Sequence, residues 1–374
     1  MTFFDERPQV RWAVPAVAVG VIAAMSFLVS RPASADTGLP PRTAAQLLVD
    51  IQQAHSDGLS GTITQTADLG IPALPGVASS SPGSSSGDAS LTSVLSGTHT
   101  WRVWVAGPTQ QRLALLGSLG ESDVVRNGAD LWVWSSKDKT ASHRVLTPPD
   151  AAGRPATASP TDLPKTPEEA AQRALAAIDP STEVTTSGAT VVAGRQAYEL
   201  VLTPRDGASR VAQVRIAVDA EKKVPLRVQV YAAGVANPAI AVAFATVDFT
   251  QPDAAMFAFT PPPGTTVTES GRPGAKPDGT APPAGQDHPA SKVVGTGWTA
   301  VVVTAAPAGG LPASGATQQR QLSGVLNALP KVSGTWGSGR LVDGTLFSAV
   351  LTDDGRLAVG AAAPEQLYAA LAAS

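Results

Sequence analysis

Cysteine is absent from the 374 residues of this chain, and that absence removes three kinds of chemistry at once. Without thiols there can be no disulfide, no thiolate nucleophile and no cysteine-bound metal. Histidine is scarce as well. The four histidines, His55, His99, His143 and His288, show none of the paired spacings that are typical of metal ligands. We therefore expect no metal and no cofactor.

An excess of charge of one sign is also missing. The formal net charge is -3 and only 15% of the residues are charged. No run of lysine and arginine is dense enough to neutralise several phosphates, so nucleic acid is not expected as a partner. A nucleophile-elbow pattern occurs at residues 83–87, but it lacks the preceding strand and following helix that an elbow needs. The sequence therefore predicts no enzyme.

One long uncharged apolar run is present, at residues 13–29, and it follows Arg7 and Arg11. Small residues at 33–35 then form the pattern that signal peptidase cleaves. We expect residues 1–35 to be a signal peptide, with an uncleaved membrane anchor as the alternative. In either case the rest of the chain is expected to be extracytoplasmic, either secreted or attached to the outer face of the cytoplasmic membrane.

Glycine and proline are abundant, at 35 and 32 residues, and they divide the chain into segments. A half-barrel domain is expected at 36–263, and a Pro, Ser and Gly tract at about 72–97 is expected to be a disordered insertion between two paired strands. A second Pro and Gly tract at 264–292 predicts a linker. Residues 293–374 then predict a small α+β domain.

Two helices are expected in the larger unit. Thr43 with Gln46 forms a capping-box pattern, and Thr166 followed by Pro167 begins a second helix that ends near residue 178. Short segments rich in β-branched residues, separated by turn signals, predict an antiparallel meander. These expected strands are 61–69, 100–105, 112–116, 123–126, 130–135, 142–146, 190–192, 197–203, 211–218, 226–231 and 239–249.

The smaller unit shows the same kind of pattern. It predicts a strand at 298–304, a helix at 318–329, a strand pair within 340–352 and a strand at 357–359. A last helix begins at Pro364.

Four tryptophans, Trp101, Trp104, Trp132 and Trp134, fall in two of the expected strands, at offsets that place them on both faces of a sheet. One interpretation is that one face is ordinary core packed against the two helices. The other is that part of this surface stays open and lines a ligand groove. A shift of one residue in strand register exchanges the two faces, so the inward direction of each side chain stays open at this stage.

Several segments resemble the LolA/RseB-like family of envelope proteins. Residues 256–267, MFAFTPPPGTTV, are similar to the closing signature of the LolA lipoprotein carriers and of the related RseB regulators. In family order, the chain also has WVAGP at 104–108, VRNGADLW at 125–132, GRQAYEL at 194–200 and Val218-Asp219 before Pro225. Together these segments cover most of residues 43–267.

The resemblance implies an α+β fold with an unclosed antiparallel β-barrel, a half-pipe with a helical lid, whose apolar hollow receives acyl chains. The expected ligand is a lipid or an acylated protein. In the carriers an arginine precedes the proline of the Trp-x-x-Arg-Pro stretch and holds the lid, whereas this chain has Gly107 before Pro108 and departs from that arrangement. The residues expected to bind lipid are Leu47, Leu48, Ile51, Trp101, Trp104, Leu113, Leu115, Trp132, Trp134, Leu200 and Phe244.

Two functions follow from the resemblance. The leading one is a non-enzymatic protein that holds an acyl chain in the half-barrel. The alternative is an RseB-like regulator that senses a lipid and binds an anti-sigma factor or another membrane partner through residues 293–374. For this second domain the comparison is architectural, since no motif match supports it.

Overall fold

The structure is a computed structural model that describes residues 38–54, 56–70, 97–117, 120–146, 165–176, 178–270, 291–306 and 328–374. The expected signal segment 1–35, nearly all of the insertion at 72–97 and most of the helix at 318–329 lie outside these ranges. Within them, no helix is long and apolar enough to cross a membrane.

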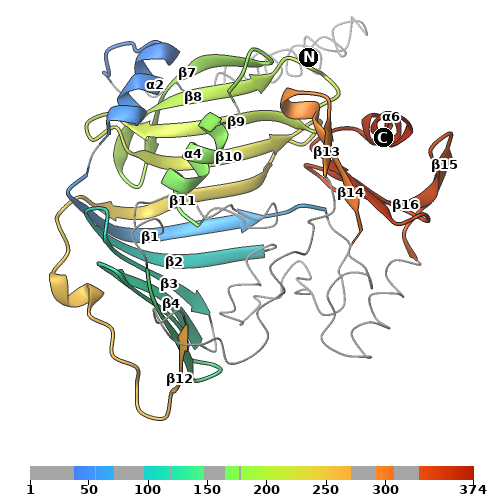
Figure 1. The fold of residues 1–374 in the computed structure, drawn as a ribbon. Coiled ribbons are helices and arrows are strands. Elements are labelled where there is room, and N and C mark those ends of the chain that lie inside the picture. The colour runs from blue at the N-terminus through green and yellow to red at the C-terminus, as the bar shows by residue number, and fades with distance from the viewer. Residues whose placement is uncertain are drawn as a thin grey trace, which may run out of the picture.

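A large curved sheet of twelve strands forms the main unit (Figure 1). Its neighbouring strands are antiparallel except for the β12–β6 pair, which is parallel, and its end strands β12 and β7 do not pair, so the barrel is unclosed. The strands in sheet order are β12 (Thr266–Ser270), β6 (Thr140–Val145), β5 (Asp130–Ser135), β4 (Gly120–Asn127), β3 (Gln110–Gly117), β2 (Gly97–Ala106), β1 (Gly58–Ala67), β11 (Pro238–Asp248), β10 (Pro225–Ala232), β9 (Val211–Asp219), β8 (Arg195–Pro204) and β7 (Thr182–Val192).

Helices α2 (Ala44–Gln53) and α4 (Pro167–Ala176) lie on one face of this sheet, which we call the inner face (Figure 1). The predicted capping box is present, because the Thr43 hydroxyl accepts from the Gln46 amide and the Gln46 side chain accepts from the Thr43 amide. Thr166 likewise accepts from the Glu169 amide at the start of α4. Local sequence therefore determines where both helices begin.

The predicted meander is confirmed, with two differences in its extent. Strand β7 begins at Thr182, earlier than the expected 190, because polar residues such as Thr185 and Thr186 suit an exposed edge strand that apolar patterning does not detect. Strand β12 lies inside the segment for which a linker was expected. Its residues 266–270 begin with three β-branched side chains, Thr266 to Thr268, and extend the sheet beside β6.

The segment that carries the resemblance to the family, 256–267, crosses the opposite face, which we call the outer face. Short helix η3 (Ala254–Phe257) buries Phe257, and the Phe259 ring lies 5.4 Å from Trp132 and 6.1 Å from Trp134. The signature is therefore a structural strap that covers aromatic residues of β5 and leads into β12.

His143 fastens β12 to its neighbours. Its Nδ1 lies 2.8 Å from Glu269 of β12, its Nε2 lies 2.9 Å from Asp130, and its ring stacks on Trp132 at 4.2 Å. Burial lowers the pKa of His143, but hydrogen bonds to Asp130 and Glu269 outweigh it and raise the pKa above its ordinary value of 6.5. The ion pairs of the charged ring with Asp130 and Glu269 therefore stabilise the fold fully below pH 6.5, and this stabilisation is lost as pH rises through the raised pKa.

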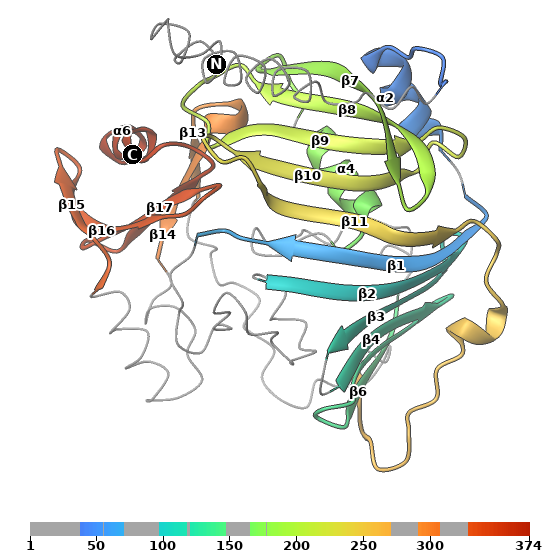
Figure 2. The same ribbon diagram turned by 180° about the vertical axis from the view of Figure 1, so that it is seen from behind.

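The smaller C-terminal unit is a separate antiparallel sheet with helix α6 (Pro364–Ala372) packed on one face (Figure 2). The predicted strand pair and the last helix are present. Trp298 was expected in a strand but lies in the short helix η4 (Gly297–Thr299), because Gly297 adopts a positive φ of 63° and interrupts extended backbone. In sheet order the strands are β13 (Lys292–Val294), β14 (Val301–Ala305), β18 (Arg356–Gly360), β17 (Ser348–Thr352), β16 (Gly337–Asp343) and β15 (Lys331–Gly334).

The C-terminal unit docks on the end of strands β8 to β10. Ser209 and Ala362 form an antiparallel bridge, flanked by backbone hydrogen bonds of 2.9 Å from Arg210 to Ala361 and from Ala363 to Ala208. Leu346 of the smaller unit is 7% exposed and belongs to the main core. The two units therefore share both hydrogen bonds and a packed apolar contact.

Candidate ligand-binding site

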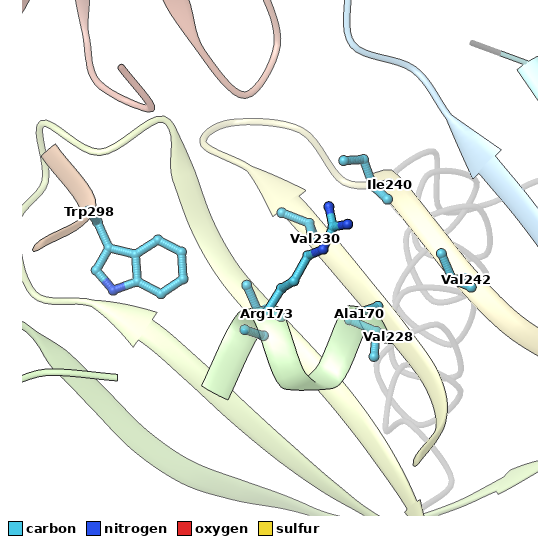
Figure 3. A pocket seen from close by; sticks show the side chains of 9 residues that line it. Ala170, Arg173, Val228, Val230, Ile240, Val242 and Trp298 are labelled. Atoms are coloured by element: carbon cyan, nitrogen blue, oxygen red, sulfur yellow. The ribbon is translucent and has the colours of Figure 1, made fainter. Parts of the chain in front are cut away.

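An apolar pocket of about 210 Å³ lies between α4 and the inner face of strands β9 to β11 (Figure 3). Its floor is formed by two cross-strand rows. Val230 pairs with Val214 on one side and Ile240 on the other, and Val228 pairs with Val242. The described residues that line it are Ala170, Arg173, Ala174, Val214, Val228, Val230, Ile240, Val242 and Trp298.

Short side chains on both walls create this space. Ala170 and Ala174 lie four residues apart, on one face of α4, and point toward the sheet. Below them Val228 and Val230 alternate along β10 on the inner face. Neither alanine nor valine is long enough to fill the distance between a helix and a sheet, so a hollow remains.

Arg173 is the single charged residue among the nine that line the pocket. Its guanidinium lies 2.6 Å from Glu169, one turn earlier on α4, and its side chain is 36% exposed. The apolar stem of Arg173 therefore lines part of the pocket, while its charged end is partly exposed and pairs with Glu169.

The inner face continues as an apolar surface beyond the pocket. Gln65 is the register partner of Val242, and Ile63, two residues away on the same face, is paired with both Phe244 and Trp101. Trp101 is fully buried and donates from Nε1 to Gln65 Oε1 at 2.8 Å. Apolar side chains thus extend from the pocket on β11 across β1 to β2.

Eight of the eleven residues expected to bind lipid lie in the inner core. Leu47, Leu48 and Ile51 of α2 pack in the same core as Leu200 of β8. A second group lies further along the inner face: Trp101, Leu113, Leu115 and Phe244. These eight are buried or half-buried on the inner side, and none of them lines the pocket under α4.

The other three, Trp104, Trp132 and Trp134, face outward, which corrects their assignment to the hollow. Trp104 alternates with the inward-facing Val103 and pairs with Arg112, whose guanidinium lies 5.6 Å from the indole. Trp132 and Trp134 pack against Phe259 of the strap. Their contacts are therefore structural. The register of the strands, which the sequence left open, places these three side chains on the outer face.

Sequence reasoning missed the residues that do line the pocket. The expected residues were leucine, isoleucine, tryptophan and phenylalanine, whereas seven of the nine lining residues are alanine, valine or arginine. A usable signal was present in β10, where Leu226, Val228 and Val230 alternate with polar residues. Trp298 gave no such signal, because its place depends on docking of the C-terminal unit.

A buried carboxyl group lies on the outer face, away from the pocket. Burial raises the pKa of Asp123 to about 7, and the neighbouring Glu121 adds to this effect while Arg112 opposes it. Asp123 and Arg112 are 2.5 Å apart. Among the described residues, no group of three His, Cys, Asp or Glu side chains could hold a metal ion.

Comparison with solved structures gives matches of low sequence identity. MucB of Pseudomonas aeruginosa, solved in complex with MucA, is 16% identical and has a TM-score of 0.43 over 88% of this chain and 96% of that chain. The lipoprotein LppX of Mycobacterium tuberculosis is 12% identical, with a TM-score of 0.28 over 54% of this chain and 93% of that chain. A LolA superfamily protein from Nitrosomonas europaea is 10% identical, with a TM-score of 0.21 over 59% and 99%.

The described residues form the kind of unclosed antiparallel half-barrel that the resemblance to LolA/RseB-like proteins implied. An unclosed antiparallel sheet with helices on its inner face agrees with what the sequence segments implied. No protein-family model matches the sequence, and no curated protein matches it. The similarity to LolA/RseB-like proteins accordingly concerns the fold alone.

Proposed function

We propose that this LolA/RseB-like protein is a non-enzymatic, extracytoplasmic binding protein that holds an acyl chain of a lipid or acylated protein. The observation that carries the proposal is the pocket under α4, whose lining is apolar except for Arg173. Hydrocarbon needs no charged partner, because burying each methylene contributes about 0.8 kcal/mol.

The size of the pocket limits how much ligand it holds as it stands. Its volume of about 210 Å³ is below the roughly 300–1,000 Å³ typical of pockets for drug-sized ligands. A long acyl chain therefore places only one part under α4.

The positive charge of Arg173 can bind the polar head of such a ligand. A partly exposed guanidinium in the lining of an apolar pocket suits a carboxylate or phosphate, which it can bind in place of Glu169. The ligand class that fits is therefore a hydrocarbon chain with an anionic head.

The purified protein is expected to carry co-extracted lipid and to take up a fluorescent fatty acid. Arg173→Gln should weaken binding of palmitate about tenfold, since a charge-assisted hydrogen bond contributes roughly 1.5–3 kcal/mol. Binding of the matching fatty alcohol, which has no anionic head, should change less than about twofold. Absence of both co-extracted lipid and fatty acid uptake in the unaltered protein would falsify the proposal.

A second candidate function is favoured by the C-terminal sheet. On the face away from α6, a row of apolar side chains crosses its strands through Val293, Val302, Val359, Ala349 and Val342. Val293 is 61% exposed and Val302 is 41% exposed. Such a surface suits a protein partner, including the membrane-bound regulator of an RseB-like system.

This candidate is tested by capture from solubilised membranes. Val302→Asp should remove a membrane-anchored regulatory protein that the unaltered chain retains, because a charge would be desolvated in the contact. Val145→Asp, at an exposed valine of the main sheet, is the control and should retain it. Equal capture by both variants would contradict the regulatory function.

A further inference from the structure

Among the described residues of the C-terminal unit, Trp298 is the one that lines the pocket. Figure 3 shows its indole at one side of the lining and Val242 at the other, with Val228 and Val230 between them. The floor therefore runs across β10 from the Trp298 side toward β11. A hydrocarbon that lies on this floor meets the flat indole at one end.

The indole is held in place by specific contacts. Its Nε1 donates to Thr182 Oγ1 at 2.8 Å, at the first residue of β7. Gly297, with its positive φ, lets the backbone approach Ser181 and Asp179 so closely that a Cβ at this position would collide with the Ser181 hydroxyl. On the other side of Trp298, the Thr299 hydroxyl donates to the Asp206 carboxylate at 3.1 Å.

Docking of the whole C-terminal unit adds to this rigidity. Arg210 of the main unit donates from Nε to Ser348 at 2.9 Å and pairs with Asp343. The Thr345 amide donates to the Leu69 carbonyl at 2.8 Å, on the far side of the same interface. Moving the Trp298 indole aside would break its hydrogen bond to Thr182, so this contact favours the orientation in which the indole lines the pocket.

We propose that Trp298 is the end wall of the acyl site, so that the C-terminal unit determines the length of hydrocarbon that the main unit accepts. This inference rests on the proposed acyl-binding function and adds a specificity-determining residue to it. The physical reason is that methylenes contribute to affinity only while they are buried. Beyond the indole, a longer chain must leave the pocket or bend.

The test is a binding series of saturated fatty acids from octanoate to stearate, measured with the full-length protein. In the unaltered protein, affinity should rise about fourfold per methylene and then level off at a limiting length. Trp298→Ala should move this limit to longer chains, with about a tenfold gain for stearate. Trp298→Leu, which keeps an apolar but shorter wall, should give an intermediate limit.

Trp336→Phe is the matched control. Trp336 stacks on Tyr368 inside the C-terminal unit and does not line the pocket, so this variant should keep the original limit. If Trp298→Ala and Trp298→Leu bind with an unchanged limiting length, the end-wall inference is wrong while acyl binding stands. If no fatty acid binds to the unaltered protein, the proposed function itself fails.

Discussion

Replacing Ala174 by phenylalanine is expected to reduce acyl binding by about two orders of magnitude. Ala174 faces the sheet from α4, and a phenyl ring at this position would occupy much of the 210 Å³ beneath it. Displacing about four methylenes removes roughly 3 kcal/mol, which corresponds to about 200-fold in Kd. Isothermal titration with palmitate measures the effect, and Ala174→Leu should give a smaller loss in the same direction.

The matched control for this prediction is Gln172→Phe. Gln172 lies on the exposed side of α4 and hydrogen-bonds Glu168, so an added ring there stays outside the pocket. Its palmitate affinity should stay within about twofold of the unaltered protein. Should Ala174→Phe fold normally by circular dichroism and still bind palmitate at full strength, the ligand lies elsewhere on the molecule.

The largest effect on stability is expected at Arg195. Its guanidinium donates to both carboxylate oxygens of Asp219, which is 1% exposed, and lies 4.9 Å from the Phe249 ring. Arg195→Leu leaves that carboxylate buried with only the Glu221 and Lys222 amides as donors. The expected loss in the free energy of unfolding is about 3 kcal/mol, measured by urea denaturation.

The pH dependence follows from the pKa of Asp219. Burial raises it, but Arg195 and the Lys222 and Glu221 amides outweigh burial and hold it below the ordinary value of 3.8. A depressed carboxyl pKa stabilises the protein above pH 3.8, and that contribution is lost as pH falls through the lowered value. The difference between Arg195→Leu and the unaltered protein should therefore be largest near neutral pH and shrink in acid.

A surface ion pair provides the comparison for this prediction. Arg205 and Glu183 are 3.8 Å apart, and both side chains are more than half exposed. Arg205→Leu should change the free energy of unfolding by less than about 0.5 kcal/mol. Similar losses for Arg205→Leu and Arg195→Leu would show that burial of Asp219 does not determine the effect.

Local patterns predicted much of the fold because local physics determines those parts. The cap at Thr43, the proline at 167 and the alternation in β8 to β11 each act within a few residues, and each element formed where they indicate. The strap at 256–267 was recognised as a family signature. Its role in covering Trp132 and Trp134 depends on contacts between distant segments, which no local pattern contains.

The candidate site was less predictable than the fold. The helix predicted to begin at Thr166 is present as α4, but small residues define a pocket only through what faces them. Ala174 and Val228 are unremarkable in sequence, and their meeting requires the helix to lie across β10. The three outward-facing tryptophans show the opposite case, because large aromatic residues were expected in the hollow but lie on the outer face.

The position of β1 in the middle of the sheet has a consequence for how the protein folds. The Thr62 amide in β1 bonds to Thr246 of β11, which is 184 residues further along the chain. During synthesis from the N-terminus, β1 and β2 can pair early. The pairing of β1 with β11 can form only after residue 248 has been synthesised. Pairing over such a separation makes folding slow, and until then β1 presents an unpaired edge that a chaperone can protect from aggregation.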